Sequence, residues 1–374
     1  MNKFKKSALV WIIALIILVF PVKCKAQSSV ETVDTSGYQV LYDNLPDDVK
    51  NLFGKLGIDD LDFDSLFNVG IEDVVNVVKN LVTGSIESPL NSLVRVLSVI
   101  VILAVFICFV PDDPKIRMIM EIIGNLVCVI SVLKPISLAI TSAVSSVTVS
   151  ENFMLLLLPV LTSVLAVSGS PALASSFQTI ALGAAQVISL VATKVVVPAV
   201  GVILALDIGS SLMPGFKISD LTTCIKKIIT TTLSFTATLF VGFLGLKGGL
   251  ATAADTVLGK GVKLVISSAV PVVGGALSEA YSGVIGSMVL VKSTLGVFGI
   301  GAVALINLPS CVQLLFWIFS FKISAAVADL FELKTVSSTF KAISSSLVLL
   351  NVVIVFVAVL FIISTALILV MKAR

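Results

Sequence analysis

The chain has 374 residues, of which 57% are hydrophobic and only 13% are charged. Soluble domains carry roughly 25% charged residues, so a fold of this size would lack the polar groups that cover a surface in water. The composition indicates a multi-pass membrane protein. The lack of histidine and the formal net charge of +3 also exclude imidazole chemistry and argue against nucleic-acid binding.

The first 26 residues have the three parts of a secretory signal peptide. Three lysines within the first six residues precede an apolar run from Ala8 to Val22, which is followed by Cys24-Lys25-Ala26. Small residues at the −3 and −1 positions predict a cleavable signal peptide over 1–26, cut after Ala26. The alternative is an uncleaved anchor helix, because Lys23 lies close to the cut.

An acidic region follows over 27–88, with twelve Asp and Glu residues against three lysines. Pro46 before Asp47 and Asp48 is typical of a helix start with acids in its first turn. Further on, apolar residues recur at helical spacing from Ile71 to Val82. The region is predicted to be extracytoplasmic and helical, either as a small domain or as amphipathic helices lying over the membrane domain.

The rest of the chain, 89–374, is predicted to be an all-α, polytopic transmembrane domain. A bilayer needs about 20 apolar helical residues per crossing. About seven spans satisfy this requirement, and they cover 90–110, 118–140, 153–170, 180–206, 228–246, 294–320 and 347–370. An exported acidic region then places the C-terminus in the cytoplasm, where Lys372 and Arg374 follow the positive-inside rule. Prolines interrupt 153–206, where a broken or re-entrant helix is the alternative.

A glycine-rich segment over 242–301 is the most distinctive part of the membrane domain. Small residues let membrane helices approach closely, so tight helix packing is one interpretation. The other is a set of broken or re-entrant helices that line a polar path. The candidate residues for packing or for a polar path are Pro271, Gly274, Gly275, Ser278, Glu279, Gly283, Gly286, Lys292, Gly296, Lys134 and Lys194.

Ionisable residues in membrane spans cost about 3 kcal/mol at a helix centre, so each needs a partner, a cavity or the interface. Glu279 and Lys292 flank the glycines and could pair if those glycines break the helix; otherwise each reaches the interface separately. Lys134 and Lys194 lie deeper, close to prolines. Arg95, Glu121 and Asp207, near the predicted ends of spans, are expected to snorkel.

The run from Pro271 to Tyr281, PVVGGALSEAY, is followed by Gly283, Gly286-Ser287, Lys292 and Leu295-Gly296 up to Pro309. This pattern resembles the core signature of the stage III sporulation protein AE family of endospore-forming bacteria. The signal sequence, the acidic region and the polytopic domain agree, so the resemblance covers essentially the whole chain.

The resemblance implies a place in the complex that joins mother cell and forespore after engulfment. The chain would lie in the mother-cell-derived outer forespore membrane and support late forespore gene expression. Its implied partners are the lipid bilayer, the other stage III A proteins including a cytoplasmic ATPase, and stage II sporulation protein Q. A homo-oligomer is a further option. No catalytic residue, metal or cofactor is implied, and no enzymatic activity is expected.

Three functions remain open from the sequence. The first is a channel or export-gate subunit of that complex, which the glycine-rich segment and the buried charges favour. The second is a secondary transporter or permease, which would require inverted repeats with matching interrupted helices. The third is a non-conducting scaffold of the same complex.

Overall fold

A computed structural model describes residues 36–56, 58, 71–109, 114–168, 170–212, 220–243 and 274–370; for residues 274–290 it describes the backbone alone. The predicted signal peptide and Pro271 lie outside the described residues. Nearly all of the described residues are helical, and none of them is in a strand. Six helices are long and apolar enough to cross a membrane. These findings confirm the predicted all-α, polytopic membrane fold.

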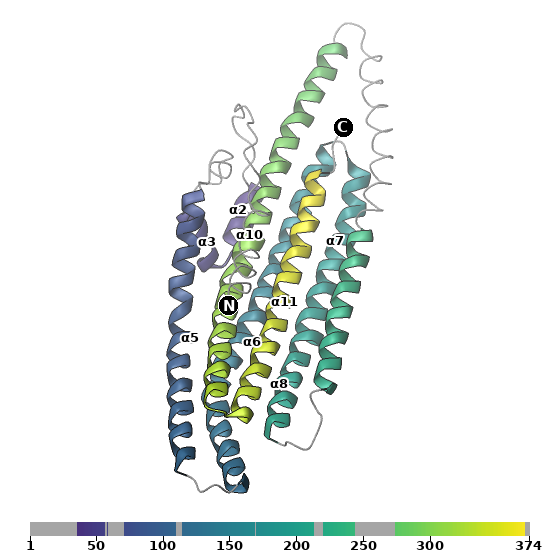
Figure 1. Ribbon diagram of the computed structural model, residues 1–374. Coiled ribbons are helices and arrows are strands. Elements are labelled where there is room, and N and C mark those ends of the chain that lie inside the picture. The colour runs from purple at the N-terminus through teal and green to yellow at the C-terminus, as the bar shows by residue number, and fades with distance from the viewer. Residues whose placement is uncertain are drawn as a thin grey trace.

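The long helices run alternately up and down in one elongated bundle (Figure 1). They are α5 (Ile71–Cys108), α6 (Pro114–Val167), the rod made of α7 (Pro171–Leu190), η1 (Val191–Val196) and α8 (Val197–Leu212), the helix Asp220–Phe243, α10 (Gly274–Leu330) and α11 (Lys334–Val370). We call the end that holds the α10–α11 turn the lower end and the opposite end the upper end.

The expected spans 118–140 and 153–170 are joined in a single helix, so the count of seven separate spans is corrected to six among the described residues. Helix α6 continues through 141–152 without a turn and contains both Pro135 and Pro159. The serines and threonines of that stretch do not break a helix, because their hydroxyls can donate back to the preceding turn. Thr141, for example, donates to the Ser137 carbonyl at 3.0 Å.

Within 153–206 the chain turns between α6, which ends at Val167, and α7, which begins at Pro171. From Pro171 onward the expected break is limited to the π-helix η1. Pro198 has no N–H, and its ring would clash with the carbonyl of Lys194 in a regular α-helix. The wider turn of a π-helix accommodates such an irregularity without ending the rod. Together, α7, η1 and α8 therefore act as one long helix with a local bulge.

Because six helices alternate in direction, α5 begins and α11 ends at the same, upper end (Figure 1). The acidic region leads into α5, whereas α11 leads to the C-terminus. The sequence-based expectation placed these two parts of the chain on opposite sides of the membrane. It rested on seven crossings, an odd number, whereas the described residues contain six candidate spans.

The helices are much longer than a bilayer is thick. Helix α6 has 54 residues, which corresponds to about 81 Å, against a hydrocarbon core of roughly 30 Å. Its large exposed apolar side chains extend from Ile116 to Leu138, and the next is Val167. Exposed apolar side chains of α5 are similarly concentrated from Val94 to Phe106, and Phe109 follows directly after the helix. An apolar belt therefore surrounds the lower half of the bundle.

Exposed basic residues border this belt. Lys134 lies 20 residues after the start of α6 and Lys194 lies 18 residues before the end of α8, which places both about 27–30 Å above the lower ends of their helices. That distance matches the hydrocarbon thickness, so both lysines can reach the lipid head groups. We infer that the belt lies in the membrane and that the upper half of the bundle extends beyond it.

Two short helices, α2 (Ser36–Asp43) and α3 (Asp47–Lys55), pack against the upper half of the bundle. Their apolar face is buried, and Phe53 stacks on Phe298 of α10 with ring centroids 5.2 Å apart. The boundary expected at residue 88 lies inside α5, because helix α5 continues through Pro89. The acidic region thus passes into the bundle without a linker between Ile71 and the membrane belt.

Candidate functional site

The glycine-rich segment does not form broken helices in its described part. From Gly274 the chain is one uninterrupted α-helix, α10, which includes Gly275, Ser278, Gly283, Gly286 and Gly296. Neighbouring turns of a membrane helix supply all of its backbone hydrogen bonds, so isolated glycines do not interrupt it. Within 274–301, the broken-helix interpretation is therefore corrected to a continuous helix.

Two of these glycines allow close packing between helices. A Cβ atom at Gly296 would overlap the side chain of Leu369 on α11, and one at Gly299 would overlap Leu157 on α6. Gly301, by contrast, has open space at the same position. Gly296 and Gly299 thus fit the packing interpretation, because they let α10 approach its two neighbours closely.

The proposed pairing of Glu279 with Lys292 does not fit a continuous α10. Thirteen residues of α-helix separate their positions by about 20 Å, and no bend brings them together. The Glu279 side chain lies outside the described residues. Lys292 is 2% exposed and is thus buried in the upper half of the bundle, whereas Lys134 and Lys194 are exposed.

A first polar cluster, the upper seam, joins α6 to α10 and consists of Ser142, Ser146, Ser150, Asn307 and Ser310. Asn307 Nδ2 donates to Ser150 Oγ at 2.7 Å, and Ser146 Oγ donates to Asn307 Oδ1 at 3.1 Å. One turn lower, the hydroxyls of Ser142 and Ser310 are 3.0 Å apart. Asn307 is 2% exposed and has partners for both atoms of its amide. The seam fixes the register of two long helices.

A second polar cluster, the lower ladder, joins α6, α8 and α11 within the apolar belt. Asn125 Nδ2 donates to Ser211 Oγ at 3.2 Å, and Thr339 Oγ1 donates to the same oxygen at 2.6 Å. One helical turn below, Thr335 Oγ1 donates to Glu121 Oε2 at 3.0 Å. The lower ladder therefore has two rungs, Glu121–Thr335 and Asn125–Ser211–Thr339.

An ion pair lies next to the lower ladder. Lys226 Nζ is 2.9 Å from Asp207 Oδ2 and also donates to Ser345 Oγ at 3.2 Å. The Asp207 side chain is only 7% exposed. The expectation that Asp207 snorkels to the interface is thus wrong, because a lysine from the neighbouring helix Asp220–Phe243 neutralises it inside the bundle.

Comparison with known proteins places these features in a family. The sequence profile described as "Stage III sporulation protein AE" matches residues 63–372, most of the chain. The chain belongs to the stage III sporulation protein AE family. A curated relative, stage III sporulation protein AE of Bacillus subtilis (strain 168), is 25% identical over 239 residues, or 64% of this chain and 60% of the relative. No solved structure matches.

This assignment confirms the resemblance seen in the sequence and shows a role in sporulation. The matched range contains the whole signature from Pro271 to Pro309 and also both polar clusters. As a stage III sporulation protein AE family member with six candidate spans, the chain is a multi-pass membrane protein. The chain covers less than two thirds of the Bacillus subtilis relative's length.

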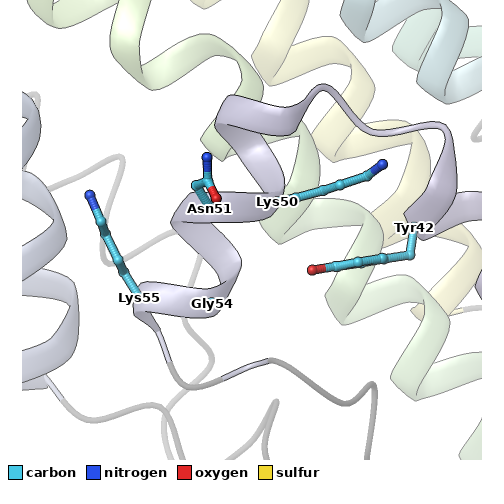
Figure 2. Close-up of a pocket in the computed structure, with 5 residues that line it drawn as sticks. All are labelled: Tyr42, Lys50, Asn51, Gly54 and Lys55. Atoms are coloured by element: carbon cyan, nitrogen blue, oxygen red, sulfur yellow. The ribbon is translucent and has the colours of Figure 1, made fainter.

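A surface hollow of about 630 Å³ lies between α2 and α3 of this family member. Its lining includes Tyr42, Lys50 and Lys55, and Figure 2 shows Lys50 stretched over the Tyr42 ring while Lys55 points away from it. Lys50 Nζ lies 6.0 Å from the ring centroid and donates to the Asp43 carbonyl at 2.9 Å. The polar groups do not point toward a common centre, as those of a ligand site would. The contacts of Lys50 instead hold α3 against α2.

Sequence reasoning about this stage III sporulation protein AE family member did not identify either polar cluster. A signal was nevertheless present, because Asn125, Ser146 and Ser150 share one helical stripe with buried apolar residues of α6 such as Cys128 and Val132. An amide on the inward stripe of an apolar helix must find a buried partner. These side chains are neutral, so a prediction based on charged residues did not include them.

Proposed function

We propose that the chain is a channel or export-gate subunit of the sporulation complex that links mother cell and forespore. The outer surface of the α6–α7 hairpin above the belt is the observation that supports this role. The exposed residues of this surface are mostly small and polar. We call it the hydroxyl face; its residues are Thr141, Ser145, Thr148 and Asn152 of α6 and Ser175, Thr179 and Gln186 of α7.

The hydroxyl face suits neither lipid nor water. Residues 139–186 contain a single charged residue, Glu151, whereas water-exposed surfaces are roughly one quarter charged. Large apolar side chains, which lipid would require, are also rare among its exposed positions before Val187. Small hydroxyl residues favour close contact with another helix. The surface thus fits a protein partner, such as the other stage III A proteins or stage II sporulation protein Q.

The secondary-transporter alternative receives less support from the helices. Transporters of that kind carry a matched pair of interrupted helices in two repeats. Among the described helices, the interruption at η1 has no counterpart in α6, where Pro135 follows Lys134 within a continuous helix. A channel conducts a substrate across the membrane, whereas a scaffold does not. A functional experiment is therefore needed to distinguish the two roles.

Photo-crosslinking in sporulating cells tests the proposal. A crosslinking amino acid at Thr148, on the hydroxyl face, should capture another membrane or intermembrane protein after engulfment, whereas the same amino acid at Ile130 in the belt should meet lipid. In the same strains, replacing Thr148 with Trp should leave the protein in the membrane but lower heat-resistant spore counts and late forespore reporter activity. Equal crosslinking at both positions, or normal sporulation of Thr148→Trp, would contradict the proposal.

The same proposal includes an orientation. Seven basic residues of the described chain lie near the lower end, namely Lys115, Arg117, Lys226, Lys227, Lys322, Lys334 and Lys341, whereas the short α6–α7 connection at the upper end contains no charged residue. The positive-inside rule places the lower end in the cytoplasm. The upper end, with the acidic region and the C-terminus, then lies outside the cytoplasm of the mother cell.

Native cysteines can check this orientation. Cys108 and Cys224 are exposed free thiols near the lower ends of α5 and of the helix Asp220–Phe243. In intact cells carrying Cys24→Ser, a membrane-impermeant maleimide should label neither thiol, but it should label a cysteine introduced at Thr83 in the upper part of α5. Labelling of Cys108 and Cys224 without permeabilisation would reverse the orientation.

A further inference from the structure

The carbonyl oxygen of Asn125 is an unpaired acceptor inside the lower ladder. Asn125 is 0% exposed, and its Oδ1 has no hydrogen-bond partner in the described part of the chain. Its Nδ2 is held by Ser211, so the planar amide keeps Oδ1 at the same rung. A buried acceptor left without a donor or a cation costs about 1–3 kcal/mol, which is why such atoms usually have a function.

A carboxylate lies one helical turn from this oxygen. Glu121 precedes Asn125 by four residues on α6, which places the two side chains about 5–6 Å apart on one face. Among the described residues, no basic side chain is within ion-pair distance of Glu121, whose carboxylate accepts a hydrogen bond from the hydroxyl of Thr335. Arg117, one turn further down, is instead 3.8 Å from Glu332.

We propose that the lower ladder binds a monovalent alkali cation between its two rungs. A cation midway between rungs about 5–6 Å apart lies within about 3 Å of oxygens from both. The available ligands are the Glu121 carboxylate, the Asn125 carbonyl and the hydroxyls of Thr335 and Thr339, all of them hard oxygen donors. The inference does not depend on the proposed channel function.

Charge decides between monovalent and divalent ions. Two further acidic residues lie near the ladder: Asp207 is already neutralised by Lys226, and Glu332 lies 3.8 Å from Arg117. A single unpaired carboxylate balances one positive charge, whereas calcium sites combine several carboxylates and six to eight oxygens. Glu121 retains partial exposure, so a cation can enter from the lower end. The upper seam lacks these properties, because the Asn307 amide is already satisfied at both atoms.

Thermal unfolding of the full chain in detergent tests the site. The melting temperature is compared in equal concentrations of sodium, potassium and N-methylglucamine chloride, of which the last cation is too large to bind. The salt of the bound ion should raise the melting temperature by about 3–8 °C over N-methylglucamine, and the shift should grow with the logarithm of its concentration. Comparison of sodium with potassium identifies the preferred ion.

Variants that conserve side-chain shape test whether the cation-dependent rise in melting temperature arises at the lower ladder. Glu121→Gln and Thr339→Val should each reduce it to within about 1 °C while the protein still folds. Asn351→Leu is the matched control, since Asn351 also has an unpaired Oδ1 but lies twelve residues from Thr339, about 18 Å along α11. Asn351→Leu should keep the full shift.

Two results would overturn the proposal. One is an equal melting temperature of the unaltered chain in all three salts, which would leave the Asn125 carbonyl with water alone. The other is a cation-specific shift that survives in both Glu121→Gln and Thr339→Val, which would place the ion elsewhere in the chain.

Discussion

Replacement of Asp207 by Asn is expected to lower the free energy of unfolding by about 2–4 kcal/mol, because it leaves Lys226 without its counter-ion in a low-dielectric setting. The pair is close, at 2.9 Å, and it joins α8 to the helix Asp220–Phe243. That helix is the least buried of the six candidate spans, so the ion pair is a major contact for it. Unfolding in mixed detergent micelles measures the loss.

Removing both charges should restore most of this stability. The double variant Asp207→Asn, Lys226→Met leaves no uncompensated ion, and its stability should lie above that of either single variant. Lys227→Met provides the matched control, since Lys227 is the next residue and is exposed; its effect should stay within about 0.5 kcal/mol. Additive losses in the double variant would show that the two charges act independently.

Asn307→Leu is expected to cost about 2–4 kcal/mol for a different reason. The change keeps the approximate size of the side chain, but the hydroxyls of Ser146 and Ser150 lose their shared partner inside the bundle. Each buried polar group without a partner costs about 1–3 kcal/mol. The same unfolding measurement applies, together with the level of the protein in the membrane.

The matched control for this variant is Asn152→Leu, which makes the same change at an exposed position of α6. Its effect should be within about 0.5 kcal/mol. Replacing Ser146 and Ser150 by Ala in the Asn307→Leu background should recover part of the loss, because apolar groups then face each other. A cost equal to that of Asn152→Leu would mean that the upper seam contributes little to stability.

Composition and apolar runs were enough to predict the class of fold. The number of spans could not be read in the same way, because the stretch 141–152 has the polarity of a loop but the backbone of a helix. Thr141 donates its hydroxyl to the preceding turn of the helix, whereas Ser142, Ser146 and Ser150 bond to residues of α10. A hydropathy average distinguishes neither case from a turn.

The candidate site was predicted less well than the fold. The sequence prediction centred on the glycines and charges of 271–296, where Gly296 lies close to the side chain of Leu369. Both polar clusters lie elsewhere and depend on which helices are neighbours, since Asn125 meets Ser211 only because α6 packs near α8. These two residues are separated by 86 residues in the sequence, so helical periodicity indicates an inward side chain but not its partner.

Helix α6 gives the molecule a single stiff axis from the lower end to the upper half. Asn125 in the membrane belt and Ser146 in the upper seam stand on this axis, 21 residues or about 32 Å apart. An axial slide of α6 by one residue, about 1.5 Å, would therefore disturb both sets of hydrogen bonds at once. A force applied to the lower end of this helix is therefore transmitted directly to the upper seam, because no turn interrupts α6 between them.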